Sequence, residues 1–292
     1  MMESLLNAWE WLAEPLSFPF MQNALVTALM IAAVCAVLSC YLVLKGWSLM
    51  GDAMSHAVLP GVVFAYLLGL PLSAGAFAAG LFCAGSVGYI KSRSRIKEDT
   101  VMGIVFSGMF AFGLVLFSKV ETDQHLMHIL FGDLLGISHA DMVGFGAAAA
   151  FILAVVILKR KDLLLYAFDP TQAKVAGLNT TVLRYGLLSL LTLAIVGAMQ
   201  IVGILLVMAM LIAPGITAQV LTRRFPSMMA VSVAVAIGST FIGVLASYHL
   251  DSAPGATIVL VQALVFTTAV AFTKLRERRI TRLAPGGAPA GA

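Results

Sequence analysis

The sequence predicts an all-α membrane protein, a polytopic transmembrane helical bundle of eight to nine spans. Of its 292 residues 61% are hydrophobic and only 11% are charged, and the mean hydropathy is +1.00. Soluble domains are about half apolar and about a quarter charged. Apolar stretches of about 20 residues recur from Phe20 to Thr273, each long enough to cross a hydrocarbon layer as a helix. Alternating strands typical of a membrane barrel do not occur in the sequence.

Nine spans are expected, with the N-terminus outside and the C-terminus inside. They cover residues 20–44, 50–70, 72–91, 100–118, 141–158, 181–199, 202–221, 228–248 and 255–273. The break at Lys45 to Trp47 is short, so residues 20–70 could instead contain a re-entrant piece. The count would then be eight, and the N-terminus would lie inside.

The chain is divided accordingly into three parts. Residues 1–17 form an extracytoplasmic N-terminal segment, and residues 18–275 form the transmembrane domain. Residues 276–292 form a cytoplasmic basic end and a tail that is too poor in apolar bulk to fold, so it is expected to be disordered.

Positive charge assigns the sides of the membrane. All of the 18 lysines and arginines except Lys119 cluster at one set of helix ends. Cytoplasmic loops of membrane proteins are enriched in these residues, so this end is expected in the cytosol. Short basic clusters beside membrane helices do not indicate nucleic acid, and no such partner is expected. The N-terminal stretch contains Glu3, Glu10 and Glu14 without a basic residue, which does not fit a removable signal peptide.

Motifs of soluble catalysis are missing from the sequence. It has no GxxxxGK[ST], no HExxH and no GxSxG. Cys35, Cys40 and Cys83 fall in apolar stretches without metal-site spacing. The protein is therefore not expected to be an enzyme or to hold a tightly bound cofactor. Energy for any transport has to come from an ion gradient or from a partner.

Asp52 and His56 are the first candidate site. They are four residues apart, so on a helix both side chains lie on one face. A carboxylate with an imidazole suits divalent ions such as Mn²⁺, Fe²⁺ or Zn²⁺. An aspartate inside a membrane costs roughly 3 kcal/mol, so such residues usually mark a pathway. The alternative is that the two residues only pair with each other. Met50 and Met54 could add soft ligands, although packing is their commoner role.

The loop at residues 168–178 is the second candidate. Asp169 can cap a helix, Pro170 suits its first position and Gly177 suits its end. This pattern predicts a helix of about two turns on the cytoplasmic side. It is either an amphipathic linker or a lever that docks into a cytosolic motor.

Two further stretches contain glycine and proline. Pro214 is expected to kink an apolar helix, with Gly203 and Gly215 allowing local breaks. Asp251 to Thr257 contains a Pro-Gly turn that leads into the last span.

These stretches together resemble the ABC-3 family of membrane permeases, the zinc, manganese and iron importers. The resemblance covers residues 18–275 and is greatest to the manganese/iron branch. The matching pieces are SLMGDAMSHAVLPG (48–61), KEDTVMGIVFS (97–107), DPTQAKVAGL (169–178), QIVGILLVMAMLIAPG (200–215) and DSAPGATIVL (251–260).

The resemblance implies an ABC-3-type permease of the bacterial inner membrane that imports divalent metal ions by alternating access. It implies two cytosolic ATPase subunits, an extracytoplasmic metal-binding protein and a second permease, identical or related. By this resemblance Asp52 and His56 line the metal path. The ATPase-coupling helix then includes Asp169, Pro170, Ala173, Gly177 and Leu178.

Two alternatives stay open from the residues alone. A secondary transporter driven by protons or sodium could use Asp52 and His56 as proton sites, although it gives the cytosolic loop helix no purpose. An intramembrane enzyme is less favoured, because no second ligand-bearing motif is present. His125, His128 and His139 could collect metal outside the membrane, or they are ordinary solvent-side residues.

Overall fold

The computed structural model describes residues 14–47, 50–119, 134 and 136–283, and this part of the chain is helical without a strand. The helices are α2 (Pro19–Lys45), α3 (Met50–Ala57), α4 (Leu59–Leu67), α5 (Leu72–Arg93), α6 (Glu98–Phe117), α8 (His139–Leu158), α9 (Arg160–Phe168), α10 (Pro170–Val175), α11 (Thr180–Val202), α12 (Ile204–Leu221), α13 (Phe225–His249) and α14 (Pro254–Leu283). The predicted all-α bundle is confirmed.

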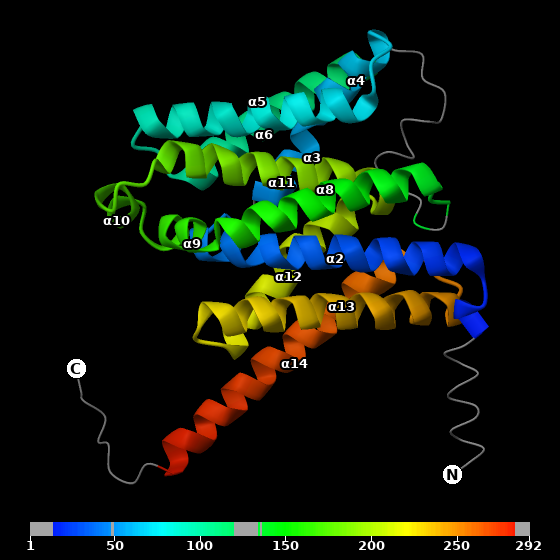
Figure 1. Ribbon diagram of the computed structural model, residues 1–292, viewed down its shortest axis with the longest axis vertical. Helices are drawn as coiled ribbons and strands as arrows, with labels where there is room; N and C mark the ends of the chain where they lie inside the picture. The colour runs from blue at the N-terminus through cyan, green and yellow to red at the C-terminus, as the bar shows by residue number, and fades with distance from the viewer. Residues whose placement is uncertain (1–13, 48–49, 120–133, 135, 284–292) are drawn as a thin grey trace.

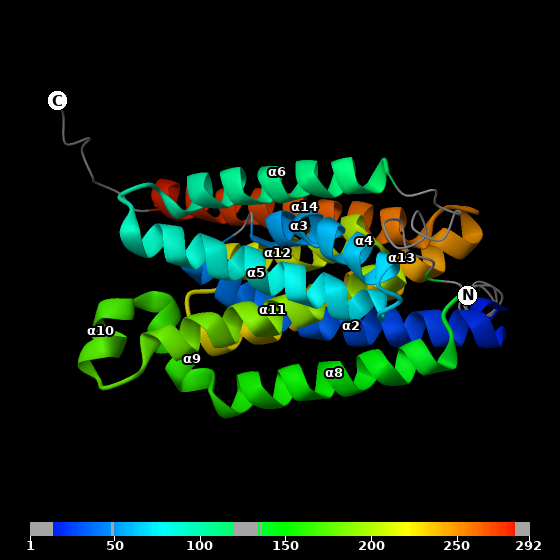
Figure 2. The same ribbon diagram turned by 90° about the horizontal axis from the view of Figure 1, so that it is seen from above.

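Eight of the described helices are long and apolar enough to cross a membrane: α2, α5, α6, α8, α11, α12, α13 and α14. They lie roughly side by side, and the far end of α14 diverges from the others (Figure 1). α2 is central, since 72% of its span is buried, whereas only 17% of the α6 span and 22% of the α8 span are buried. α6 and α8 lie on opposite sides of the bundle (Figure 2). Peripheral faces of this kind suit contact with lipid or with another subunit.

The continuous helix expected over residues 50–70 is wrong. The segment forms two short helices, α3 and α4, which meet at Val58. Pro60 lies in the first turn of α4, and a proline cannot donate the helical hydrogen bond to the residue four positions earlier. Because α2 and α5 both end on basic residues, α3 and α4 must return the chain from the basic end toward the opposite end. The broken segment therefore adds a ninth, discontinuous passage to the eight long helices.

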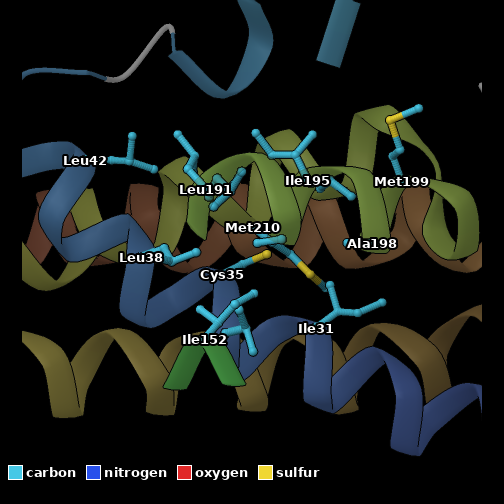
Figure 3. Close-up of a cluster of buried hydrophobic side chains, with 14 of the residues drawn as sticks. Ile31, Cys35, Leu38, Leu42, Ile152, Leu191, Ile195, Ala198, Met199 and Met210 are labelled. Atoms are coloured by element: carbon cyan, nitrogen blue, oxygen red, sulfur yellow. The ribbon is translucent and has the colours of Figure 1, made fainter. Parts of the chain in front are cut away.

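The core is built around α2 (Figure 3). Ile31, Cys35 and Leu38 of α2 are fully buried and lie near Ile195 of α11 and Met210 of α12. The three cysteines are free and buried, as small apolar residues would be. The face of α2 that meets α11 and α12 therefore supports the whole assembly.

Two glycines shape the stretch from Gln200 to Gly215. Gly203 has a φ of +78° and separates α11 from α12, as expected. Gly215 could have allowed a local break, but α12 runs through it without one, as the expected span 202–221 implies. Its N–H donates to the Ser39 hydroxyl at 3.0 Å, and an added Cβ would lie 2.8 Å from the carbonyl oxygen of Ser39. Gly215 therefore allows α12 to approach α2 closely, while Pro214 lies inside the same helix.

Replacing Gly61 with alanine is expected to destabilise the permease strongly. A Cβ on Gly61 would collide with the main-chain oxygen of Gly75 and lie 2.6 Å from the Cβ of Ala79, because α4 and α5 pack backbone to backbone. Overpacking of this kind costs about 1–3 kcal/mol. The thermal midpoint of the detergent-solubilised protein, followed by size-exclusion chromatography, should fall. Gly238→Ala is the matched control, because nothing lies within 4 Å of its added Cβ. Equal midpoints for the two variants would contradict the packing argument.

Candidate metal path and coupling helix

Helix α3 presents one polar edge in an otherwise buried element. Every residue of α3 is buried except Asp52 and His56. Their side chains remain 39% and 32% exposed, respectively. The sequence spacing therefore places both side chains on one face, as predicted, and that face is the part of α3 the rest of the chain leaves uncovered.

The two side chains contact each other directly. His56 Nε2 lies 3.2 Å from Asp52 Oδ1. The carboxylate can therefore orient the imidazole, and either group can turn outward to a ligand. In the described residues no group of three or more His, Cys, Asp or Glu side chains could hold a metal ion. One chain thus supplies two ligands at this position, which is fewer than a closed divalent site needs.

The contacts of α3 place this pair at mid-depth. The His56 ring packs against Phe106 and Phe110 of α6, with centroids 6.4 Å and 5.1 Å away. Both phenylalanines are near the middle of α6, whose 20 residues run from Glu98 to Phe117. Thr192, which contacts α3 through Met54, is near the middle of α11. The pair therefore lies level with the middle of these two long helices.

Met50 and Met54 take the packing role. Met50 is 1% exposed and Met54 is fully buried. The Met54 sulfur accepts a hydrogen bond from the Thr192 hydroxyl at 3.6 Å, on the buried side of α3. The thioethers are therefore directed into the core, and the chemistry of this site rests on Asp52 and His56.

The second candidate motif, residues 169–178, folds as its residues predict. Asp169 Oδ1 accepts hydrogen bonds from the N–H groups of Thr171 and Gln172, at 2.8 Å and 3.0 Å, and Pro170 is the first residue of α10. The Leu178 N–H donates to the Ala173 carbonyl at 3.0 Å, and Gly177 has a φ of +81°. This bonding pattern closes a helix with a left-handed glycine.

Helix α9, which precedes α10, was not predicted. Lys159, Arg160 and Lys161 indicated a loop, whereas the apolar residues that follow them continue as helix. Lys45 at the end of α2 donates to the Tyr166 carbonyl at 3.3 Å, and its Nζ lies 4.2 Å from the centre of the Tyr166 ring. These contacts attach α9 to the bundle, so α10 is held at the basic end.

The outer surface of the α9–α10 unit is apolar at two points. Phe168 is 70% exposed and Val175 is 84% exposed, whereas Ala173 is fully buried. This surface lies at one end of the bundle, well apart from α3 (Figure 1). The structure thus keeps the two candidate sites separate.

Of the three candidate histidines, the structure describes only His139. His139 is exposed at the start of α8. His125 and His128 lie outside the described residues, as do most of the N-terminal segment and the tail from Ala284. Both alternatives, a metal-collecting surface and ordinary solvent-side residues, therefore stay open.

The comparison with known families decides what kind of protein this is. Residues 17–273 match the model described as "ABC 3 transport family". The chain belongs to the ABC 3 transport family. The family match covers the bundle, the broken α3–α4 segment and helix α10.

Relatives of this ABC 3 protein are named as metal transporters. It is 60% identical over 270 residues to a "Probable iron transport system membrane protein" of Haemophilus influenzae, covering 92% of this chain and 100% of the relative. It is 49% identical to the manganese transport system membrane protein MntB of Synechocystis, covering 90% and 86%. The solved structure of PsaBC from Streptococcus pneumoniae in complex with Fab matches with a TM-score of 0.80 and 37% identity, covering 92% and 99%.

The protein is therefore a multi-pass permease subunit of an ABC importer in a bacterial membrane. ATP is hydrolysed by a separate ATPase subunit in such systems, and the permease itself is not an enzyme. ATPase and substrate-binding partners are implied by the family. The alternative of a proton- or sodium-coupled transporter is not supported by these relatives.

Proposed function

We propose that this permease carries Mn²⁺ or Fe²⁺ across the inner membrane, with Asp52 and His56 as a transit site on the path. The supporting observation is that a carboxylate and an imidazole, 3.2 Å apart at mid-depth, are the only residues of α3 that are not buried. Borderline dications accept this pair of ligands. The ligands also suit Zn²⁺, but the relatives named above are iron and manganese systems.

The uncovered face of α3 supports the inference that a second permease subunit packs against it. A charged side chain facing lipid at the middle of a membrane costs about 2.5–3.5 kcal/mol, so Asp52 requires a polar neighbour. A second permease, identical or related, would cover this face and add its own carboxylate and imidazole. Four ligands from two chains would bind a dication better than the two from one chain, yet leave it able to move on.

The basic end supports the orientation of the complex. Lysines and arginines gather at the ends of α2, α5 and α8, and by the positive-inside rule this supports a cytosolic position for that end and for the C-terminus. Helix α10 would then seat on the cytosolic ATPase through Asp169 to Leu178. The metal-binding protein would dock at the opposite end. Residues 18–275 form the permease domain in this assignment, flanked by the extracytoplasmic segment and the basic tail.

Reconstitution of the permease with its ATPase tests this function. The two subunits should copurify from detergent, and vesicles containing them should accumulate radiolabelled Mn²⁺ only with ATP and the binding protein. Excess Fe²⁺ should compete strongly, and excess Zn²⁺ weakly. Metal accumulation driven by a pH gradient, with no ATPase present, would refute the proposal.

A further inference from the structure

Helices α13 and α14 carry three buried polar side chains without a hydrogen-bond partner. Most buried serine, threonine and glutamine side chains in the described residues make hydrogen bonds: Thr27, Ser39, Ser55, Thr192, Thr217, Ser232, Ser247 and Thr257. Ser239, Thr240 and Gln262 do not. They are 2%, 0% and 1% exposed, and neither the two hydroxyls nor either amide atom of Gln262 has a partner.

These three residues lie at the same height along the packed pair of helices α13 and α14. α13 and α14 are joined by a short turn and run antiparallel, and a Cβ on Gly243 would lie 2.6 Å from the Cα of Ile258. Ser239 and Thr240 are one turn before Gly243 on the same side of α13. Gln262 is one turn after Ile258 on α14. The antiparallel register therefore brings all three residues to the same height.

The three residues lie deep in the bundle, and the two hydroxyls do not bond to a carbonyl of their own helix. Gln262 lies eight residues after Pro254, about 12 Å into a layer of about 30 Å. Thr217 on α12 and Thr222 at its C-terminal cap donate to the carbonyl four residues earlier, at 2.7 Å and 2.6 Å. Ser239 and Thr240 make no such bond. Unpaired polar groups in an apolar interior are costly, so this cluster calls for a ligand.

We infer that the α13–α14 cluster, Ser239, Thr240 and Gln262, binds one or two water molecules that bridge the two helices. A buried water typically makes two to four hydrogen bonds. The two hydroxyls can donate or accept, while the Gln262 amide offers one acceptor and two donors. The cluster carries no charge, so it suits water rather than the transported dication. The site is separate from the Asp52–His56 pair.

Substitutions that keep volume distinguish a hydrated cluster from a dry one. Gln262→Met should lower the thermal midpoint of the permease–ATPase complex by about 2–4 °C, because the water and the hydroxyls lose partners. The triple variant Ser239→Ala, Thr240→Val, Gln262→Met should recover most of that loss, because it removes every group that needs the water. Ser247→Ala is the control, since its hydroxyl bonds the Val244 carbonyl within the same helix, and its midpoint should stay unchanged.

A high-resolution structure of the wild-type complex in lipid nanodiscs gives a second readout that does not depend on variants. Density for water within hydrogen-bond distance of Gln262 and a hydroxyl of α13 is the expected result. Two results would overturn the inference. One is a midpoint that rises with Gln262→Met and rises further with each added substitution, as for a dry, unpaired cluster. The other is direct pairing of Gln262 with Ser239 or Thr240 and no water density.

Discussion

Replacing Asp52 or His56 with alanine is expected to reduce ATP-driven Mn²⁺ uptake to the level seen without ATP. In the proposed transit site each chain would contribute Asp52 and His56, so either substitution would remove half of its share. The structural cost should be small, about 0.5 kcal/mol or less, because both side chains are partly exposed. Uptake of radiolabelled Mn²⁺ into vesicles, with assembly checked by size-exclusion chromatography, measures the effect.

Two control variants remove an aspartate or a histidine that lies away from α3. They test whether the effect is specific to Asp52 and His56. Asp162→Ala removes a carboxylate at the basic end that lies 3.6 Å from Lys159 Nζ. His139→Ala removes an exposed imidazole at the opposite end. Both should transport normally. Normal uptake by Asp52→Ala and His56→Ala would instead show that the pair serves packing alone.

Placing aspartate at Phe168 and Val175 together is expected to abolish association with the ATPase and, with it, ATP-driven uptake. These are the exposed apolar side chains of the α9–α10 unit, at 70% and 84% exposure, and a docked partner would bury them. Charged groups in a buried apolar contact are costly unless they are paired. Copurification of the ATPase with the tagged permease is the direct measurement, and the permease midpoint should not change.

Leu250→Asp is the control for the coupling surface. Leu250 is also 70% exposed, but it follows α13 at the end opposite to α10. This variant should retain the ATPase. Full ATPase recovery with the Phe168 and Val175 double variant would assign the docking surface to another part of the basic end.

The long helices were predictable because apolar stretches mark the segments that cross a membrane and basic residues mark their ends. The span expected at 141–158 is found at His139–Leu158, and the span expected at 202–221 is found at Ile204–Leu221. Helix ends outside the lipid were harder to place. α14 was expected to end at residue 273, but it continues to Leu283. Lysine and arginine are good helix formers, so the helix outlasts its apolar stretch.

The candidate sites were predictable only where they depend on neighbours in sequence. The contact of Asp52 with His56 follows from their spacing of four, and the caps of α10 follow from Asp169 and Gly177. The phenylalanines of α6 beside His56 depend on packing between distant segments, which one sequence does not reveal. The break at Val58 had a visible signal in Pro60, but the apolar run that contains it indicates one continuous helix.

The interruption between α3 and α4 also changes the electrostatics of the bundle interior. Because Pro60 has no N–H, the main-chain oxygen of His56 cannot receive a bond from that position. A helix that stops inside a membrane presents the negative end of its dipole there, and discontinuous helices in transporters commonly offer such carbonyls to cations. A metal ion passing the proposed Asp52–His56 site could therefore also meet the main-chain oxygen of His56, which an unbroken helix would keep bonded.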